Sequence, residues 1–182
     1  MLPALAGCGP AKLDVHGIDV SGADFGKDFS LKAPDGTVHT MASFEDKLVM
    51  IFFGFTQCPD VCPTALLRAS DIKRMLGEDG ERLQVLFITI DPERDTPEIL
   101  SAYTQAFDPS FLALYGDAEQ TAKTVKDFRI YAQKVKTGNT YTMDHTSLSY
   151  LYDTRHRLRV LLRHEQSAQE CVDDIRQVLA NT

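Results

Sequence analysis

The stretch that decides the fold reads LVMIFFGFTQCPDVCPT and runs from Leu48 to Thr64. It opens with an apolar run rich in Val, Ile and Phe and closed by a glycine, which is typical of a strand buried on both faces. Pro59 and Pro63 suit the first turn of a helix, where a missing N–H costs little. The sequence therefore predicts a buried strand that delivers Cys58 to a helix N-terminus and Cys62 about one turn into that helix.

The spacing of the two cysteines has chemical consequences. Cys58 and Cys62 are related as i and i+4, so on a helix they share one face and lie about 6 Å apart. Two sulfurs in that position can converge on one metal ion or close a disulfide. A helix N-terminus also favours the thiolate over the thiol, which makes both sulfurs better metal ligands and better nucleophiles. Metal binding and thiol redox chemistry are both open, whereas a purely structural disulfide across so short a loop would stabilise little.

The composition narrows the class of protein. A chain of 182 residues is long enough for one domain that buries about 70% of its unfolded surface. The net charge of −7, with no cluster of Lys or Arg, argues against a nucleic-acid partner. The sequence contains no run of about 20 apolar residues, which is the length that predicts a transmembrane helix. Four cysteines are too few for a disulfide framework.

The N-terminal segment differs from the remainder of the chain. Residues 1–28 are interpreted as a terminal segment and linker, because residues 11–28 are rich in Gly and Asp and show no sustained period; residues 29–182 are interpreted as the folded domain. Leu5-Ala6-Gly7-Cys8 resembles the lipobox of bacterial lipoproteins, in which the cysteine is acylated after cleavage before it. The apolar run ahead of it is short and has no basic region. We expect a lipid on Cys8; the alternative is an ordinary terminal cysteine.

Strand and helix patterns alternate along the remainder of the chain. Further strands are predicted at 83–90, 111–115, 148–152 and 158–162, and helices at 59–76, 97–107, 118–128 and 168–179. Turn signals at 34–36 and 138–139 predict hairpins within 29–41 and 131–143. This order predicts an α/β fold of thioredoxin-like type, with a central mixed β-sheet flanked by helices and extra β-hairpins.

Three local motifs occur in order: GFTQCPDVCPT from Gly54 to Thr64, DPERDTP from Asp91 to Pro97, and Asp144-His145-Thr146. Together they closely resemble the Sco/SenC family of copper-binding assembly factors for cytochrome c oxidase, over roughly residues 29–179. By that resemblance the cofactor is copper, as Cu(I) or Cu(II), and its ligands are Cys58, Cys62 and His145.

The resemblance also implies a place and a partner. Proteins of this family are thioredoxin-like, tethered to a membrane and exposed on its outer side, which in a bacterium is the periplasmic face of the cytoplasmic membrane. They are thought to deliver copper to, or keep reduced, the cysteines of the CuA centre in cytochrome c oxidase subunit II. The implied role is that of a metallochaperone rather than an enzyme. Another periplasmic copper donor is an implied second partner.

The chemistry of the residues agrees with this ligand set. Soft thiolates and one imidazole suit Cu(I), and three ligands leave the exchangeable position that a delivery protein needs, whereas structural zinc would normally take a fourth protein ligand. Asp91 ends a buried strand at the edge where such sheets place their chemistry, and Asp60 lies between the cysteines. Both are candidates to support the ligands, although Asp91 also suits an ordinary turn and Asp60 the helix N-terminus.

The main alternative is a thiol–disulfide oxidoreductase on the same fold, one that would reduce the CuA-site cysteines. Thioredoxin-type enzymes resemble one another in a Cys-x-x-Cys and a facing cis-proline, but here three residues separate Cys58 from Cys62 and no proline follows Pro109. Peroxiredoxins resemble one another in Thr-x-x-Cys, and here Thr56 is one residue too close to Cys58. These departures argue against a general redox enzyme, but they leave open the selective reduction of one partner protein.

Overall fold

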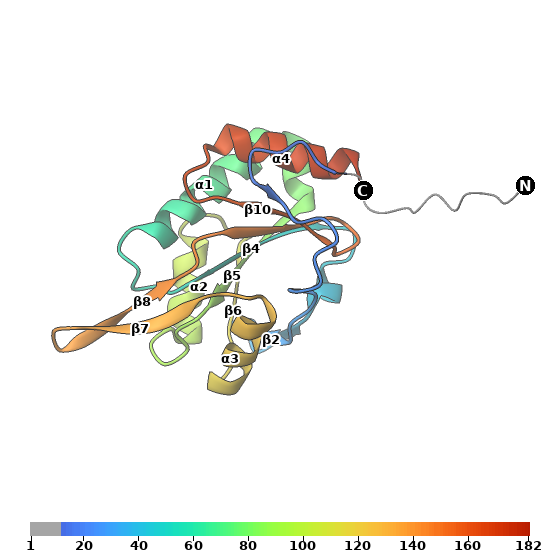
Figure 1. The fold of residues 1–182 in the computed structure, drawn as a ribbon. Coiled ribbons are helices and arrows are strands. Elements are labelled where there is room, and N and C mark those ends of the chain that lie inside the picture. The colour runs from blue at the N-terminus through green and yellow to red at the C-terminus, as the bar shows by residue number, and fades with distance from the viewer. Residues whose placement is uncertain (1–11) are drawn as a thin grey trace, which may run out of the picture.

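A six-stranded mixed sheet forms the centre of the protein in the computed structural model, which describes residues 12–182 (Figure 1). Its strands lie in the order β1-β10-β9-β4-β5-β6. Strands β4, β5 and β6 run parallel, while β9, β10 and β1 extend the sheet by antiparallel pairing. The strand bounds are β1 Ile18–Asp19, β4 Leu48–Gly54, β5 Leu83–Thr89, β6 Leu112–Leu114, β9 Ser149–Tyr152 and β10 Leu158–Leu162.

Strand β4 lies in the middle of this sheet and is buried along its whole length. Helices α1 (Val61–Leu76) and α4 (Ala168–Ala180) lie together on one side of the sheet, and α2 (Pro97–Gln105) and α3 (Ala118–Asp127) lie on the other (Figure 1). This double cover explains why β4 has no polar face. The inner face of α1 repeats at helical spacing, with buried Cys62, Leu66, Ala69 and Ile72.

Local sequence signals account for the helix ends. Thr96 accepts a hydrogen bond from the Ile99 N–H and precedes a proline at the first helical position of α2. Asp117 and Ser167 form capping boxes at the starts of α3 and α4. In the described part of the chain, no helix is both long and apolar enough to cross a bilayer.

Two hairpins stand outside the main sheet. The first pairs β2 (Leu31–Lys32) with β3 (Val38–His39) and leads into a 3₁₀ turn, η1 (Met41–Phe44); a second 3₁₀ segment, η2 (Gly77–Arg82), follows α1. The second hairpin pairs β7 (Ala132–Thr137) with β8 (Thr140–His145) and extends away from the body of the domain (Figure 1). Its turn uses Gly138 at φ +59°, a conformation that glycine adopts without strain.

The fold predicted from sequence, a thioredoxin-like α/β domain with a central mixed sheet flanked by helices, is confirmed. One detail at the site was wrong: α1 begins at Val61 rather than at Pro59. The Cys58 N–H instead donates to the carbonyl of Phe55 at 3.2 Å, so Cys58 lies in a turn before the helix. Cys62 accordingly lies in the first turn rather than one turn into the helix.

The sheet also gains a strand from the segment interpreted as a linker. Ile18 and Asp19 pair with β10, and the backbone N–H groups of His16 and Gly17 donate to the buried carboxylate of Asp174 at 2.7 and 2.9 Å. A two-residue strand carries no periodic signal that a sequence pattern could reveal. Cys8, the lipidation candidate, lies outside the described residues.

Candidate metal centre

Three elements meet at one end of the central strand. Cys58 comes from the turn after β4, Cys62 from the first turn of α1, and His145 from the last residue of β8. Their Sγ, Sγ and ring-nitrogen atoms all lie within 4.8 Å of one another. Cys62 Sγ is 3.8 Å from His145 Nε2, and the Cys62 N–H donates to Cys58 Sγ at 3.4 Å. The fold thus brings together the three residues singled out as ligands.

Cys62 is the buried member of the pair and is held by tight packing. Its side chain is fully enclosed and lies against the backbone of Gly54, where a Cβ would come within 2.8 Å of Cys62 Sγ and 2.8 Å of the Phe87 ring. Such distances are well inside van der Waals contact. A glycine at the end of β4 is therefore required for this sulfur to sit where it does.

Cys58 is half-buried and chemically distinct from Cys62. A hydrogen bond from the Cys62 thiol lowers the pKa of Cys58 to about 3, with further help from the backbone N–H groups of Asp60 and Cys62, against the opposing effect of burial. The same hydrogen bond, together with burial, raises the pKa of Cys62. Cys58 is therefore the member of the pair that ionises more readily.

His145 is oriented so that one nitrogen faces the sulfurs. Its Nδ1 lies 2.8 Å from the carbonyl oxygen of Thr146, and because a carbonyl only accepts, Nδ1 carries the proton. In the neutral ring, the lone pair of Nε2 then points toward Cys62 Sγ. The rings of Phe52 and Phe55 meet the imidazole edge-on at centroid distances of 6.2 and 5.8 Å. This arrangement fixes both the tautomer and the tilt of the ring, as at many metal sites.

The donor set fits a soft metal ion. With metal–sulfur and metal–nitrogen bonds of about 2.3 and 2.0 Å, two ligands at trigonal angles are separated by about 3.7 to 4.0 Å. The observed distance of 3.8 Å from Cys62 Sγ to His145 Nε2 is of that size. Two thiolates and an imidazole suit Cu(I), and three ligands rather than four distinguish the site from structural zinc.

A hollow of about 220 Å³ opens the site to its surroundings. Cys58 and His145 line it, together with Met143 from the hairpin. The buried sulfur of Cys62 forms the inner end of the site and the partly exposed Cys58 forms the outer end. A metal ion or a partner's thiol would approach from the side of Cys58.

The two supporting aspartates lie outside the cysteine–histidine triad. The carbonyl oxygen of Asp60 accepts a hydrogen bond from the Thr64 hydroxyl at 2.8 Å, and Asp60 also lines the hollow. Asp91 is almost fully buried and accepts from the Tyr141 hydroxyl at 2.7 Å and from Arg94. Asp91 therefore contacts the hairpin that carries His145, and its suggested influence on the ligands stays a prediction, as does that of Asp60.

Sequence reasoning did not single out several residues that build this site. Arg94 and Tyr141 join the DPERDTP loop to the hairpin, and Asp95 anchors the turn before the cysteines by accepting from the Thr56 hydroxyl at 2.6 Å and the Thr89 hydroxyl at 2.6 Å. Burial raises the pKa of Asp95 despite these bonds. The available signal was the density of charged residues in DPERDTP directly after a buried strand.

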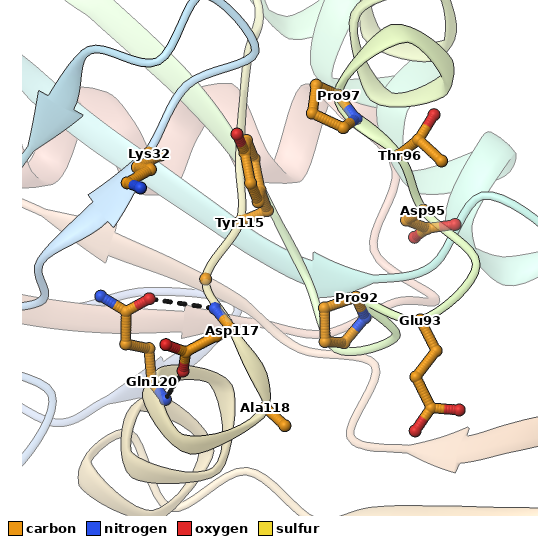
Figure 2. A pocket seen from close by; sticks show the side chains of 11 residues that line it. Lys32, Pro92, Glu93, Asp95, Thr96, Pro97, Tyr115, Asp117, Ala118 and Gln120 are labelled. Carbon is orange, nitrogen blue, oxygen red and sulfur yellow. Dashed lines mark hydrogen bonds between the residues drawn. The ribbon is translucent and has the colours of Figure 1, made fainter.

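A separate hollow of about 410 Å³ lies between the DPERDTP loop and the start of α3 (Figure 2). Neither cysteine nor histidine lines it. Asp117 and Gln120 are already paired in the cap of α3, as Figure 2 shows, and Asp95 is held by Thr56 and Thr89. These three side chains are therefore engaged in structure, and among residues 12–182 the cluster of possible metal ligands is the one in the cysteine–histidine hollow.

Fold and site together define a thioredoxin-like protein with two cysteines and a histidine positioned to bind one metal ion. Comparison with known proteins makes the assignment specific. The SCO1/SenC family model matches residues 19–180, and the chain belongs to that family.

Relatives and solved structures agree with the assignment. An SCO2-like protein of Rickettsia prowazekii is 34% identical over 81% of this chain and 74% of its own length. The mitochondrial SCO2 homolog of Bos taurus is 37% identical over 84% of this chain and 59% of its own. Copper-bound ScoI of Bradyrhizobium japonicum is 39% identical with a TM-score of 0.77, covering 85% of this chain and 99% of that structure. Copper-bound yeast Sco1 is 32% identical with a TM-score of 0.79, covering 88% and 91%.

Proposed function

We propose that this protein is a copper metallochaperone that binds one copper ion through Cys58, Cys62 and His145 and supports assembly of the CuA centre of cytochrome c oxidase. The observation that carries the proposal is the convergence of two sulfurs and one imidazole nitrogen within 4.8 Å at an open hollow. Membership of the SCO1/SenC family and the copper in two solved relatives support it.

The asymmetry of the site suits transfer rather than storage. Cys58 has a lowered pKa and is half-buried rather than enclosed, so it can bind the incoming ion first and be approached by an acceptor's thiol later. Cys62 and His145 are held by packing and hydrogen bonds and form the fixed part of the site. Because three ligands leave a coordination position free, a ligand from the acceptor can bind before a chaperone ligand leaves.

The proposed acceptor is the CuA domain of oxidase subunit II, and the proposed donor is another periplasmic copper protein. We place the domain on the outer face of the cytoplasmic membrane, held by a lipid on Cys8. The sequence Leu5-Ala6-Gly7-Cys8 supports the anchor. Mass spectrometry of the membrane-extracted native protein would test it, because acylation adds a defined mass to the peptide that begins at Cys8.

Anaerobic copper titration tests the central part of the proposal. Reduced protein should take up one equivalent of Cu(I), and Cu(II) should produce a sulfur-to-copper charge-transfer band. Cys58→Ser and His145→Ala should each weaken binding strongly, whereas Met143→Leu and His16→Ala, which leave the triad intact, should not. Wild-type protein that takes up no copper would overturn the proposal.

The second candidate is selective thiol–disulfide exchange, favoured by the pairing of a half-exposed Cys58 with an enclosed Cys62. The Cys58 thiolate would attack a partner disulfide and release one partner thiolate. Cys62, after losing its proton, would then attack the mixed disulfide. The partner would gain two electrons and two thiols, and this protein would hold the new disulfide. Rapid stoichiometric reduction of a model disulfide by protein that binds no copper would favour this candidate over the chaperone.

A further inference from the structure

We propose that Arg94 is the positioning residue that holds the β7–β8 hairpin against the cysteine turn and thereby sets where His145 lies. The inference rests on the proposed function, because it concerns the same metal site. It adds a residue that touches no ligand atom and acts through the hairpin that carries one ligand.

Hydrogen bonds from Arg94 join three separate segments. Its guanidinium donates to Asp91 in the loop after β5, to Gln57 Oε1 beside Cys58 at 3.1 Å, and to the carbonyl oxygen of Tyr141 in β8 at 2.8 Å. The side chain of Arg94 is 16% exposed and that of Asp91 is 1% exposed. Hydrogen bonds to charged groups at sites so poorly solvated are stronger than those at the surface.

Stacking adds to this connection. The guanidinium carbon of Arg94 lies 3.7 Å from the centroid of the Tyr141 ring and 5.9 Å from that of Phe55. The Tyr141 hydroxyl donates a hydrogen bond at 2.7 Å to the carboxylate oxygen of Asp91 that Arg94 does not contact. The Phe55 ring contacts the imidazole of His145. Arg94 therefore sits between the ring that fixes β8 and a ring that borders the histidine.

The hairpin has little else to fix it. Its two strands pair only with each other among the described residues, and most side chains of β7 are exposed. Isolated two-stranded hairpins are marginally stable in water. Across residues 12–182, its other polar side-chain links to the body are the Tyr141–Asp91 hydrogen bond, the Cys62–His145 contact and an exposed ion pair between Lys134 and Glu93. Its apolar contacts are those of His145 with the Phe52 and Phe55 rings and the packing of Ala132 and Met143 on the core. Arg94 adds a hydrogen bond to the Tyr141 carbonyl oxygen and a stack on the Tyr141 ring, so it supplies a large share of the polar contacts that hold the hairpin.

The geometry requires arginine rather than any cation. Two guanidinium nitrogens share three acceptors, because Nε donates to Asp91 and Nη1 donates to both Gln57 and Tyr141, and the guanidinium also stacks on the Tyr141 ring. Lysine offers a compact ammonium that can keep the charge near Asp91 but lacks the planar fork. Arg94→Lys should therefore behave more like Arg94→Gln than like the wild type.

Hydrogen exchange of the metal-free protein tests the inference without copper. In Arg94→Gln, amides of β7 and β8 should exchange at least about tenfold faster, since each lost charge-assisted bond corresponds to a tenfold effect or more. Lys134→Gln, which breaks the exposed pair between the same two segments, should accelerate exchange no more than about fivefold. Amides of β4 and β5 in the same samples are the internal reference.

Copper spectroscopy then tests the consequence for His145. With Cu(II) added anaerobically to reduced Arg94→Gln, the sulfur-to-copper band should persist while nitrogen hyperfine coupling from His145 weakens or disappears; in Lys134→Gln both should match the wild type. Unchanged hairpin exchange, an equal rise in β4 and β5, or full nitrogen coupling in Arg94→Gln would each overturn the role of Arg94. Wild-type protein without copper uptake would overturn the proposed function instead, and the exchange comparison would still decide on Arg94.

Discussion

Replacing Gly54 by alanine tests whether packing at the end of β4 places the buried sulfur. The added Cβ would meet Cys62 Sγ and a Phe87 ring carbon at 2.8 Å each and a Phe52 ring carbon at 3.1 Å. Two of these neighbours are rings in the central core, so the sulfur is the atom that can move most easily. Overpacking of this kind costs about 1–3 kcal/mol.

Two measurements separate the effects of this substitution. Thermal unfolding of metal-free Gly54→Ala should shift down by about 2–4 °C for each kcal/mol lost. Copper affinity, measured by competition with a Cu(I) chelator, should fall about tenfold or more, because a sulfur displaced by several tenths of an ångström no longer meets the distances that the other two ligands set.

Gly36→Ala is the matched control. Gly36 has φ +87° in an open turn, where a Cβ meets nothing within 4 Å. Alanine there costs about 1–2 kcal/mol of backbone strain and should leave copper affinity unchanged. A Gly54→Ala protein with wild-type copper affinity, or a Gly36→Ala protein that loses it, would refute the packing argument.

Three further predictions concern the scaffold. Arg159 and Asp153 form a buried ion pair at 3.1 Å, so Arg159→Met should cost about 3 kcal/mol in urea unfolding, while Lys123→Gln, at an exposed pair, should cost no more than about 0.5 kcal/mol. Burial raises the pKa of Asp153, but hydrogen bonds from arginine groups outweigh it and hold that pKa below 3.8. Because Asp153 has a lower pKa in the folded protein than in the unfolded chain, its stabilisation is present above the unfolded-state pKa and is lost as the pH falls through the folded-state pKa. Asp153→Asn should therefore flatten the acid limb of the pH–stability curve. An unchanged slope would contradict this. Ser167→Ala should cost about 1 kcal/mol by removing the cap of α4 without altering copper binding.

Local signals in the sequence predicted much of the fold. An apolar run buried on both faces predicted β4, and local residue patterns predicted α2, α3 and α4 close to their observed bounds. These features depend on residues near one another in the chain, so a pattern can reveal them. Strand β1 was not predicted, because two residues are too few to show a periodic pattern. The start of α1 was misplaced because either of two prolines could occupy the first helical turn.

The sequence predicted the ligands of the site but not the residues that hold those ligands in place. Cys58 and Cys62 are neighbours in sequence, but His145 was linked to them through family resemblance, since a separation of more than 80 residues leaves no local signal. The contacts of Arg94 with Gln57 and Tyr141 depend on how a hairpin folds back onto a loop. No motif fixes that geometry, and it emerged only with the tertiary structure.

The most direct test of the central claim is X-ray absorption at the copper edge of protein loaded with one equivalent of Cu(I). The site predicts two sulfur ligands at about 2.3 Å and one nitrogen ligand at about 2.0 Å, with the nitrogen lost in His145→Ala and one sulfur lost in Cys58→Ser. A copper environment without sulfur, or one that neither substitution changes, would contradict a centre built from Cys58, Cys62 and His145.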